Sequence, residues 1–375
     1  MTPLHGLKVI ELARVLAGPW AGQTLADLGA EVIKVESPSG DDTRKWGPPF
    51  IERDGDTSAA YFHSTNRGKS SVTADFRTPE GRALVEGLVR DADVLIENFK
   101  VGGLKKYGLD YDSLSRINPR LIYCSITGFG QDGPYADRAG YDYVIQGMCG
   151  LMSVTGDPAG QPQKTGVAVT DIFTGLYGVI AIQAALIQRN TSGRGQHIDL
   201  ALLDCGVAIM ANQALNYLSS GNAPQRLGNA HPNLVPYQVF DCQDGWVIIA
   251  TGNDGQFTRL CAMLGRDDLG TSPDYASNAK RVENRETLAA EINAETAKLT
   301  RAELLAACES QGVPAGPIND MADVFADPQV QARGLQRDDN GVPLVRSPFR
   351  FSDAETAPLR AAPALDADGD RLRKR

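Results

Sequence analysis

The sequence predicts an α/β fold in which helices cover a parallel sheet. Short apolar runs at residues 7–12, 31–35, 71–74, 94–97 and 121–125 alternate with segments of helical pattern. Apolar strands joined by helical crossovers are typical of parallel sheets, because both faces of such a sheet are buried. The length of 375 residues exceeds the size at which single cores stop growing, so we expect two domains.

Composition restricts the kind of partner. The 37 Lys and Arg residues and the 46 Asp and Glu residues give a formal net charge of −9, so we expect no binding to nucleic acid or to a membrane surface. An anionic ligand would need a local group of basic residues to oppose this global charge. Six cysteines without a CxxC pair favour a reducing compartment, and four scattered histidines suggest no metal site.

We expect a soluble, cytoplasmic protein. The N-terminus shows no charged leader followed by an apolar core and a cleavage site. The most apolar run, residues 172–187, is shorter than a membrane span and is typical of a core helix.

The first predicted unit is a strand at 7–12, the loop ARVLAGPWAG, a helix at 20–28 and a strand at 31–35. The loop lacks the GxGxxG pattern of dinucleotide sites, and Pro19 removes one amide that a phosphate would use. Glu36, at the end of the second strand, only weakly resembles a ribose-binding acid. A nicotinamide dehydrogenase is therefore an alternative that rests on this unit alone.

Two later segments carry side chains that could meet a ligand. Residues 37–66 are polar and rich in Gly and Pro, which predicts a long surface loop where Trp46 and Tyr61 either line a pocket or pack the loop onto the body. Lys100 and Lys106 follow the strand at 94–97, where open α/β sheets bind ligands, although a solvated lysine face has the same pattern.

Asp171 lies directly before the apolar helix predicted over 172–187, and the chain is organised around this stretch. An Asp at a helix N-terminus commonly acts as a cap that accepts a backbone hydrogen bond. The helix dipole and the free amides also keep such a carboxylate ionised and able to attack an electrophile. Both interpretations stay open at this point.

The second half of the chain predicts a strand at 197–200 and a helix to about residue 219, followed by a turn-rich crossing at 221–236. Residues 237–251 alternate as a hairpin with a turn at 244–245. Helices are expected at 256–264, 281–299 and 301–311, and two short ones within 320–333. The last 25 residues lose periodicity, which predicts a frayed terminus.

The order of motifs resembles the family III CoA-transferases, also called the CaiB/BaiF family. The motifs are LARVLAGPWAGQTLADLGAEVIKVE, GDDTRKWGPPF, ENFK, GFGQDGP, GYDYVIQ, TGDPAGQPQKTG, TSGRGQHIDLALLD, RLGNAHPNLVPYQVF and GVPAGPIN. The resemblance runs from residue 7 to about residue 335. It implies an interlocked homodimer, with a Rossmann-like large CoA-binding domain from residues 1–220 and 331–375 and a smaller α+β domain with its linkers from residues 221–330.

The resemblance also implies a mechanism. The carboxylate matching Asp171 attacks an acyl-CoA thioester to give a mixed anhydride and CoA thiolate, the thiolate returns to form an aspartyl-CoA thioester, and an acceptor acid reverses the sequence. An Asp of ordinary pKa is ionised at pH 7 without a partner base, which suits this role. CoA or acyl-CoA would be a substrate, and no tightly bound cofactor or metal is expected.

The same correspondence implies which residues hold CoA. The residues are Leu16, Ala17, Ala74, Asp75, Phe76, Arg77, Asn98, Phe99, Lys100, Lys106, Ala139, Gly140, Tyr141 and Asp142. We expect Lys100 and Lys106 to meet the phosphates.

The sequence also departs from the formyl-CoA:oxalate branch of the family. That branch carries Gln, Arg and Lys where this chain has Leu16, Ser37 and Ala139, which disfavours oxalate and formate. The segment GNAHPNLVPYQ is similar to the branch acting on succinate with glutarate or related dicarboxylates. His231 either binds the distal carboxylate or is a structural loop residue.

Two alternatives share the fold that the resemblance implies. An α-methylacyl-CoA racemase would need a His base where this chain has Tyr141, and a tyrosine is a poor base at neutral pH. A noncatalytic CoA-binding protein would use Asp171 only as a cap.

Overall fold

The computed structural model describes residues 1–53 and 55–374, which form two compact units. Unit 1 contains Met1–Leu151, Lys164–Asn222 and the chain from Pro328 onwards. Unit 2 contains Met152–Gln163 and Ala223–Asp327.

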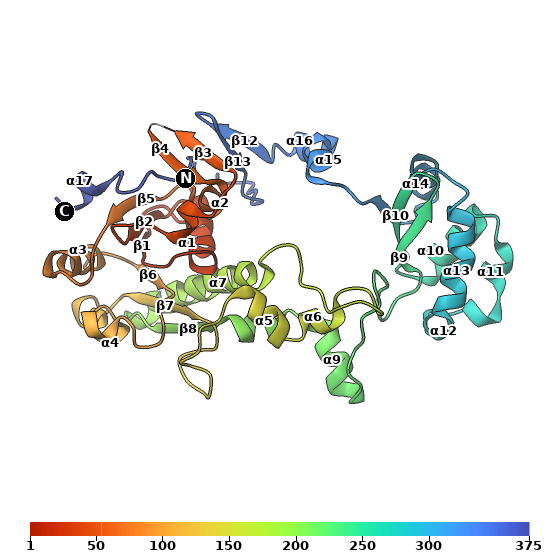
Figure 1. The fold of residues 1–375 in the computed structure, drawn as a ribbon, viewed down its shortest axis with the longest axis horizontal. Coiled ribbons are helices and arrows are strands. Elements are labelled where there is room, and N and C mark those ends of the chain that lie inside the picture. The colour runs from red at the N-terminus through yellow and green to blue at the C-terminus, as the bar shows by residue number, and fades with distance from the viewer. Residues whose placement is uncertain (54, 375) are drawn as a thin grey trace. The chain divides into compact units, whose positions relative to one another are not determined.

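Unit 1 is built on a six-stranded sheet whose neighbouring strands all pair in parallel (Figure 1). From edge to edge the strands are β5 (Ser70–Thr73), β2 (Glu31–Glu36), β1 (Lys8–Glu11), β6 (Val94–Glu97), β7 (Ile122–Thr127) and β8 (His197–Ala201). The α/β prediction is confirmed. Within this sheet the chain order is 3-2-1-4-5-6, the order of the dinucleotide-binding fold, with a switch point between β1 and β6.

Side chains alternate between the two faces of this sheet. Val9 and Val94 pack on one face with α1 (Ala17–Asp27) and α7 (Val169–Ser192), whereas Ile10 and Leu95 pack on the other. That second face is covered by α3 (Pro79–Val89) and α4 (Tyr111–Ile117). Two helical layers bury both faces of the strands, which explains their nearly continuous apolar sequences.

Helix α7 differs from its prediction in length and in exposure. It begins at Val169 and ends at Ser192, so Asp171 lies inside its first turn rather than before it. By length and composition this helix could also cross a membrane. One face packs against α1, but Phe173, Ile180 and Ile187 on another face are exposed, so the prediction of a core helix was wrong for that face.

Residues 37–66 are not the long loop that their composition predicted. The described part forms the short 3-10 helix η1 (Asp42–Lys45), the hairpin of β3 (Phe50–Arg53) and β4 (Asp56–Ala59), and α2 (Ala60–Asn66). Arg44 anchors the segment, because its guanidinium bonds to both carboxylate oxygens of Glu36 and lies 3.7 Å from the centre of the Phe62 ring. Buried ion pairs therefore order a segment that looks polar in sequence.

The C-terminal segment is tied to unit 1 rather than frayed. After α16 (Pro328–Ala332) come the hairpin of β12 (Gln336–Asp339) and β13 (Val342–Val345) and the short α17 (Gly369–Leu372). Asp366 accepts a hydrogen bond from the backbone N–H of Thr73, and Asp368 accepts one from that of Ser71. These bonds along β5 hold a segment that has little periodicity of its own.

Unit 2 contains an antiparallel sheet of β9 (Tyr237–Cys242), β10 (Gly245–Ala250) and β11 (Ala315–Pro317), which confirms the hairpin at 244–245. Its helices are α10 (Asp254–Met263), α11 (Asp267–Thr271), η3 (Pro273–Tyr275), α12 (Asn278–Glu283), α13 (Arg285–Thr296), α14 (Arg301–Ser310) and α15 (Met321–Ala326). The helix predicted over 281–299 is instead two helices that meet at Asn284.

Short helices connect the remaining parts of the chain. They are η2 (Lys105–Tyr107), α5 (Asp142–Met148), α6 (Leu151–Val154), α8 (Leu202–Ala208) and α9 (Ala211–Ser220). The single helix predicted up to about residue 219 is broken between α8 and α9, where Ala211 has a φ of 42°.

Candidate active site

A cleft of about 450 Å³ opens at the carboxyl ends of β1, β6 and β7. This is the switch point of the sheet, where open α/β folds place their ligands. Eleven of the residues singled out in the sequence line it: Leu16, Ala17, Trp46, Asn98, Phe99, Lys100, Lys106, Ala139, Gly140, Tyr141 and Asp171. The structure thus brings Asp171 into one cleft with segments far from it in the chain.

A strained turn leads from β1 into α1 at the base of the cleft. Val15 has a φ of 69°, which is unusual for a β-branched residue. Its backbone N–H donates to both carboxylate oxygens of Asp41, at 3.3 and 3.2 Å. Lys34 in turn bonds to Asp41 and to the carbonyl of Ala13. The buried ion pair holds Leu16 at the N-terminus of α1, where no side chain caps the helix.

Asn98 joins the turn after β1 to the turn after β6. Its Oδ1 accepts from the backbone N–H of Arg14 at 3.0 Å, and its Nδ2 donates to the carbonyl of Arg14 at 2.7 Å. This paired contact fixes the distance between two walls of the cleft. A similar close approach occurs at Gly128 and Gly140, where a Cβ on either residue would lie 2.6 Å from the other's Cα.

Asp171 projects from the first turn of α7, beside the N-terminus of α1. One turn further along, a Cβ on Gly175 would lie 2.7 Å from the carbonyl oxygen of Ala17. Residues four apart share a helix face, so the contact at Gly175 sets Asp171 against the Leu16–Ala17 turn. Backbone packing, rather than an ion pair, positions this carboxylate.

The capping interpretation of Asp171 was wrong, because another residue performs that function. Asp142 on α5 accepts from the backbone N–H of Thr170 at 2.9 Å and from its hydroxyl at 2.7 Å. Within residues 1–53 and 55–374, nothing donates a hydrogen bond to the Asp171 carboxylate. The partly buried carboxylate faces the cleft without a partner.

Burial and the nearby Asp142 carboxylate raise the pKa of Asp171 from 3.8 to about 7. The sequence argument that this group has an ordinary pKa and is fully ionised at neutral pH therefore needs correction. Burial disfavours the charged form, and a like charge adds to the effect. A carboxylate of raised pKa is also more basic, which strengthens it as a nucleophile once it is ionised.

Of the two aromatic residues singled out in residues 37–66, Trp46 lines the cleft and Tyr61 packs against it from outside the lining. Their rings pack edge to face at 5.3 Å, and Trp46 lines the cleft while 46% exposed. Burial and the charges of Asp171, Asp142 and Asp41 raise the pKa of Tyr61, so its hydroxyl is neutral and close to these carboxylates.

Four cationic side chains surround the cleft in a chain of net charge −9. Lys100 and Lys106 were singled out in the sequence, whereas Arg14 and Arg138 were missed. Arg14 makes an exposed ion pair with Asp42 at 3.1 Å. Because exposed ion pairs are weak, an anionic ligand can replace Asp42 as the partner of Arg14. The signal in the sequence was available, because Arg14 lies within the selected motif that begins LARVLAGPWAG and Arg138 lies two residues before the motif GYDYVIQ.

The remaining predicted contacts lie outside the lining of this cleft. Ala74 and Asp75 border a separate hollow beside α3, and Arg77 pairs with Asp75 at 2.8 Å. Phe76 connects the two places through its ring contact with Phe99, at 6.1 Å between centroids. Asp142 is not in the lining of the cleft, and its Oδ1 caps α7 at Thr170.

His231 belongs to unit 2, where its own loop orients it. Its Nδ1 accepts from the backbone N–H of Asn233 at 3.0 Å, and its ring lies 5.1 Å from that of Tyr237. Burial and Arg285 lower the pKa of His231, so the ring is neutral and Nε2 carries the proton. The role of His231 toward a distal carboxylate stays a prediction.

The dehydrogenase alternative loses its ribose-binding acid. Glu36 accepts two hydrogen bonds from Arg44, one from the hydroxyl of Ser71 and one from the backbone N–H of Asp41. Its side chain is buried and saturated, so it has no free oxygen for a ribose.

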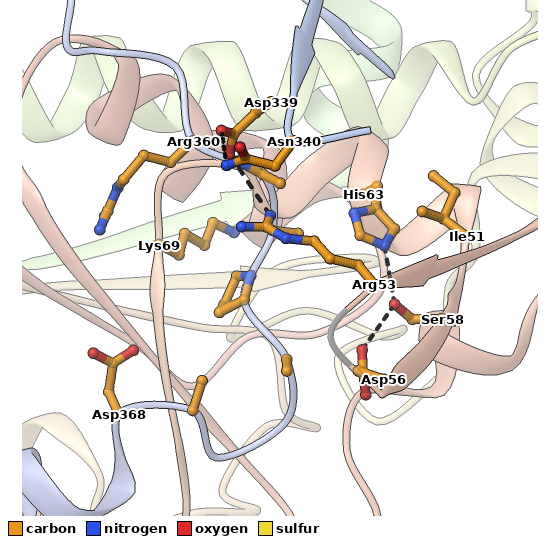
Figure 2. Close-up of a pocket in the computed structure, with 15 residues that line it drawn as sticks. Ile51, Arg53, Asp56, Ser58, His63, Lys69, Asp339, Asn340, Arg360 and Asp368 are labelled. Carbon is orange, nitrogen blue, oxygen red and sulfur yellow. Dashed lines mark hydrogen bonds and ion pairs between the residues drawn. The ribbon is translucent and has the colours of Figure 1, made fainter. Parts of the chain in front are cut away.

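A second cavity of about 480 Å³ lies between the β3–β4 hairpin and the C-terminal segment (Figure 2). Ser58 bridges the Nε2 of His63 at 3.0 Å and the carboxylate of Asp56 at 3.3 Å. Arg53 forms an ion pair with Asp339 at 3.6 Å. None of the residues predicted for catalysis or binding lines this cavity, and we assign the active site to the cleft at Asp171.

Comparison with known proteins shows the family to which the chain belongs. Residues 4–369 match the model of CoA-transferase family III. The chain is 61% identical to "Succinate--glutarate CoA-transferase" of Agrobacterium fabrum, over 97% of this chain and 93% of that one. It is 43% identical to the human "Succinyl-CoA:glutarate CoA-transferase", over 95% and 83%. The crystal structure of a CaiB/BaiF family protein from Brucella suis is 62% identical, with a TM-score of 0.91 over 100% and 99% of the two chains.

Proposed function

Since this chain belongs to CoA-transferase family III, we propose that it moves CoA from a donor thioester to a free dicarboxylic acid through Asp171. The observation that carries the proposal is the unpartnered Asp171 carboxylate in a cleft at the sheet's switch point. The succinate and glutarate named for the relatives support dicarboxylates as the substrate class.

The proposed first half-reaction begins when an Asp171 oxygen attacks the thioester carbonyl carbon. The C–S bond breaks, CoA leaves as a thiolate, and an acyl-aspartyl anhydride forms. The thiolate then attacks the Asp171 carbonyl carbon of the anhydride. This step releases the donor acid as a carboxylate and leaves an aspartyl-CoA thioester.

The second half-reaction repeats these steps in reverse with the acceptor. Its carboxylate attacks the aspartyl thioester to form a new anhydride and CoA thiolate. The thiolate attacks the acyl carbon of the acceptor, which yields the product thioester and regenerates the Asp171 carboxylate. No net proton transfer is needed, so the proposed mechanism requires a carboxylate and no partner base.

The chain's own groups suit each charge in this sequence. Lys100, Lys106, Arg14 and Arg138 offer cations for the CoA phosphates and the carboxylates of the acids. The backbone amides of Ala17 and Gly18, at the uncapped N-terminus of α1, are donors for the developing oxyanion.

The test is transfer of CoA from succinyl-CoA to glutarate, followed by chromatography of the thioesters. Asp171→Asn should lower kcat/KM by more than about 10³-fold, and Asp171→Glu by at least about 10²-fold, because the carboxylate is displaced. Asp112→Asn, which removes an exposed carboxylate from the first turn of α4, is the matched control and should keep wild-type activity. Transfer by Asp171→Asn at the wild-type rate would refute the mechanism.

The racemase alternative makes a different prediction in the same cleft. Incubation with a 2-methylacyl-CoA in D₂O would incorporate deuterium at C2 without any acceptor acid. We expect no incorporation, since Tyr141 supplies no efficient base.

We also propose a homodimer in which a second copy covers the outer face of α7. Phe173, Tyr177, Ile180 and Ile187 recur there at helical spacing, and Ile187 is 71% exposed. Analytical ultracentrifugation should give twice the mass of one chain, and Ile180→Glu with Ile187→Glu should shift it toward the monomer. A wild-type monomer at micromolar concentration would exclude the dimer.

A further inference from the structure

Asp142 is more than a cap, because it belongs to a buried chain of hydrogen bonds behind the reactive carboxylate. Its Oδ1 accepts hydrogen bonds from the backbone N–H and the hydroxyl of Thr170. Its Oδ2 accepts from the Nε2 of Gln146 at 2.7 Å. The Oε1 of Gln146 accepts from the backbone N–H of Thr165 at 2.9 Å. Gln146 and Thr170 are both fully buried.

We propose that Asp142 and Gln146 are positioning residues that hold the first turn of α7, and with it Asp171, at the reacting distance from the cleft wall. This inference rests on the proposed nucleophilic role of Asp171. Asp142 directly follows Gly140 and Tyr141, which line the cleft, so one side chain ties the wall to the helix that carries the nucleophile.

Gln146 extends the same restraint to the segment before α7. Its amide bridges Asp142 and Thr165, and it also lies 3.4 Å from the carbonyl of Val167. The approach of the chain to α7 and the first turn of the helix are thus held by two side chains of α5. A shift of about 1 Å in a catalytic group can cost about 10²-fold in rate, so these contacts bear directly on catalysis.

The direction of the hydrogen bonds permits a swap that keeps the geometry. Asp142→Asn alone places an amide N–H₂ against the donor Nε2 of Gln146, and Gln146→Glu alone sets two carboxylates against each other. In the double variant, the new amide donates to the new carboxylate, while Thr170 and Thr165 keep their acceptors. Only the long contact to Val167 loses its donor.

The charge at position 142 supplies a second readout. The charged side chains near Asp171 are Asp142 on α5 and, around the cleft, Arg14, Asp42, Lys100, Lys106 and Arg138. Tyr61, Tyr107 and Tyr141 are further titratable groups among the described residues. Removing the Asp142 charge lowers the pKa of Asp171, so the acid limb of the pH–rate profile moves to lower pH. This shift reports that the two carboxylates are close, whereas recovery of kcat in the double variant reports the positioning role.

The experiment measures kcat/KM for succinyl-CoA and glutarate from pH 5.5 to 8.5 in wild type, Asp142→Asn, Gln146→Glu and the double variant. Each single variant should lose about 10- to 100-fold in kcat, with donor KM within about threefold of wild type. The double variant should recover most of kcat, and Asp142→Asn should show the displaced acid limb. Thermal unfolding of all four proteins checks that they are folded.

Two results would overturn the inference. The first is wild-type kcat in either single variant. The second is a double variant whose kcat does not exceed that of both single variants, because additive losses would mean independent structural effects. Asp171→Asn measured alongside separates the two proposals. If it is inactive while Asp142→Asn behaves as wild type, the nucleophile stands and the positioning network fails; if Asp171→Asn is active, the proposed function itself fails.

Discussion

Carboxylates in unit 1 occur in two contrasting settings around the same cleft. Glu11 and Asp41, behind the turn into α1, are buried and share the ammonium group of Lys34 at 3.0 and 2.9 Å. Lys69 adds a second cation to Glu11. Within the part of the chain that the structure describes, Asp171 makes no ion pair, and the charge that acts on it is the like charge of Asp142.

The pKa values follow this difference. Lys34 and the backbone N–H of Thr43 hold the pKa of Asp41 below its ordinary value despite burial. Burial and Asp142 raise the pKa of Asp171 to about 7. The paired carboxylates lock a strained backbone turn in place, whereas the unpaired one is kept reactive at a cost in stability.

Removing the cation of the buried ion pairs should have the largest effect on the stability of the fold. Lys34→Met leaves Glu11 and Asp41 buried without their shared cation, and we expect a loss of about 3–5 kcal/mol in the free energy of unfolding. Denaturant unfolding measures it. Lys280→Met, which removes an exposed ion pair with Glu283, should leave the free energy of unfolding nearly unchanged. Equal losses in the two variants would contradict the distinction between the buried and exposed pairs.

The position of the unpaired Asp171 carboxylate depends on backbone packing between α7 and α1, which a single methyl group can disturb. Gly175→Ala places a Cβ 2.7 Å from the carbonyl of Ala17, so α7 must move away from α1. We expect a loss of about 1–3 kcal/mol, with at least about tenfold lower kcat. Gly87→Ala in α3, where a Cβ meets nothing within 4 Å, is the matched control and should be neutral or stabilising. Unchanged kcat in Gly175→Ala would show that packing does not position Asp171.

The smallest expected effect is a gain in stability at the reactive carboxylate. The pKa of Asp171 is about 7 in the folded chain and ordinarily 3.8, so the folded chain binds the extra proton between these values. The stability contributed by this group therefore falls as pH rises from about 4 to about 7 and is then level. Asp171→Asn should raise Tm by roughly 1–3 °C at pH 8 and by less at pH 5.

Differential scanning calorimetry at the two pH values, with Asp112→Asn as the control, measures this gain. A lower Tm for Asp171→Asn at pH 8 would mean that the carboxylate stabilises the fold, as the paired carboxylates do.

Much of the fold could be predicted because its signals are local. The strand at Val94–Glu97 and the hairpin turn at 244–245 follow from short apolar runs and turn residues in the sequence itself. The resemblance to a known family identified Asp171 as the candidate nucleophile and identified most of the predicted CoA-binding residues that line the cleft. These predictions required no knowledge of distant contacts.

The features that sequence analysis missed depend on such contacts. Arg44 orders residues 37–66 by binding Glu36 and Phe62, and no local periodicity reveals that arrangement. Asp142 caps a helix 28 residues further along the chain, so Asp171 looked like the natural cap. The raised pKa of Asp171 likewise follows from burial and a neighbour on another helix. In sequence alone, the exposed apolar face of α7 cannot be distinguished from a buried one.

The most direct test of the reactive role is to find the covalent intermediate. The purified protein would be incubated with succinyl-CoA without acceptor, quenched in acid, and examined by intact-mass spectrometry and peptide mapping. We predict a CoA adduct on Asp171 in the wild type and none in Asp171→Asn, with succinate released in equal amount. An adduct on another residue, or continued CoA transfer by Asp171→Asn, would contradict the assignment of the unpaired carboxylate as the nucleophile.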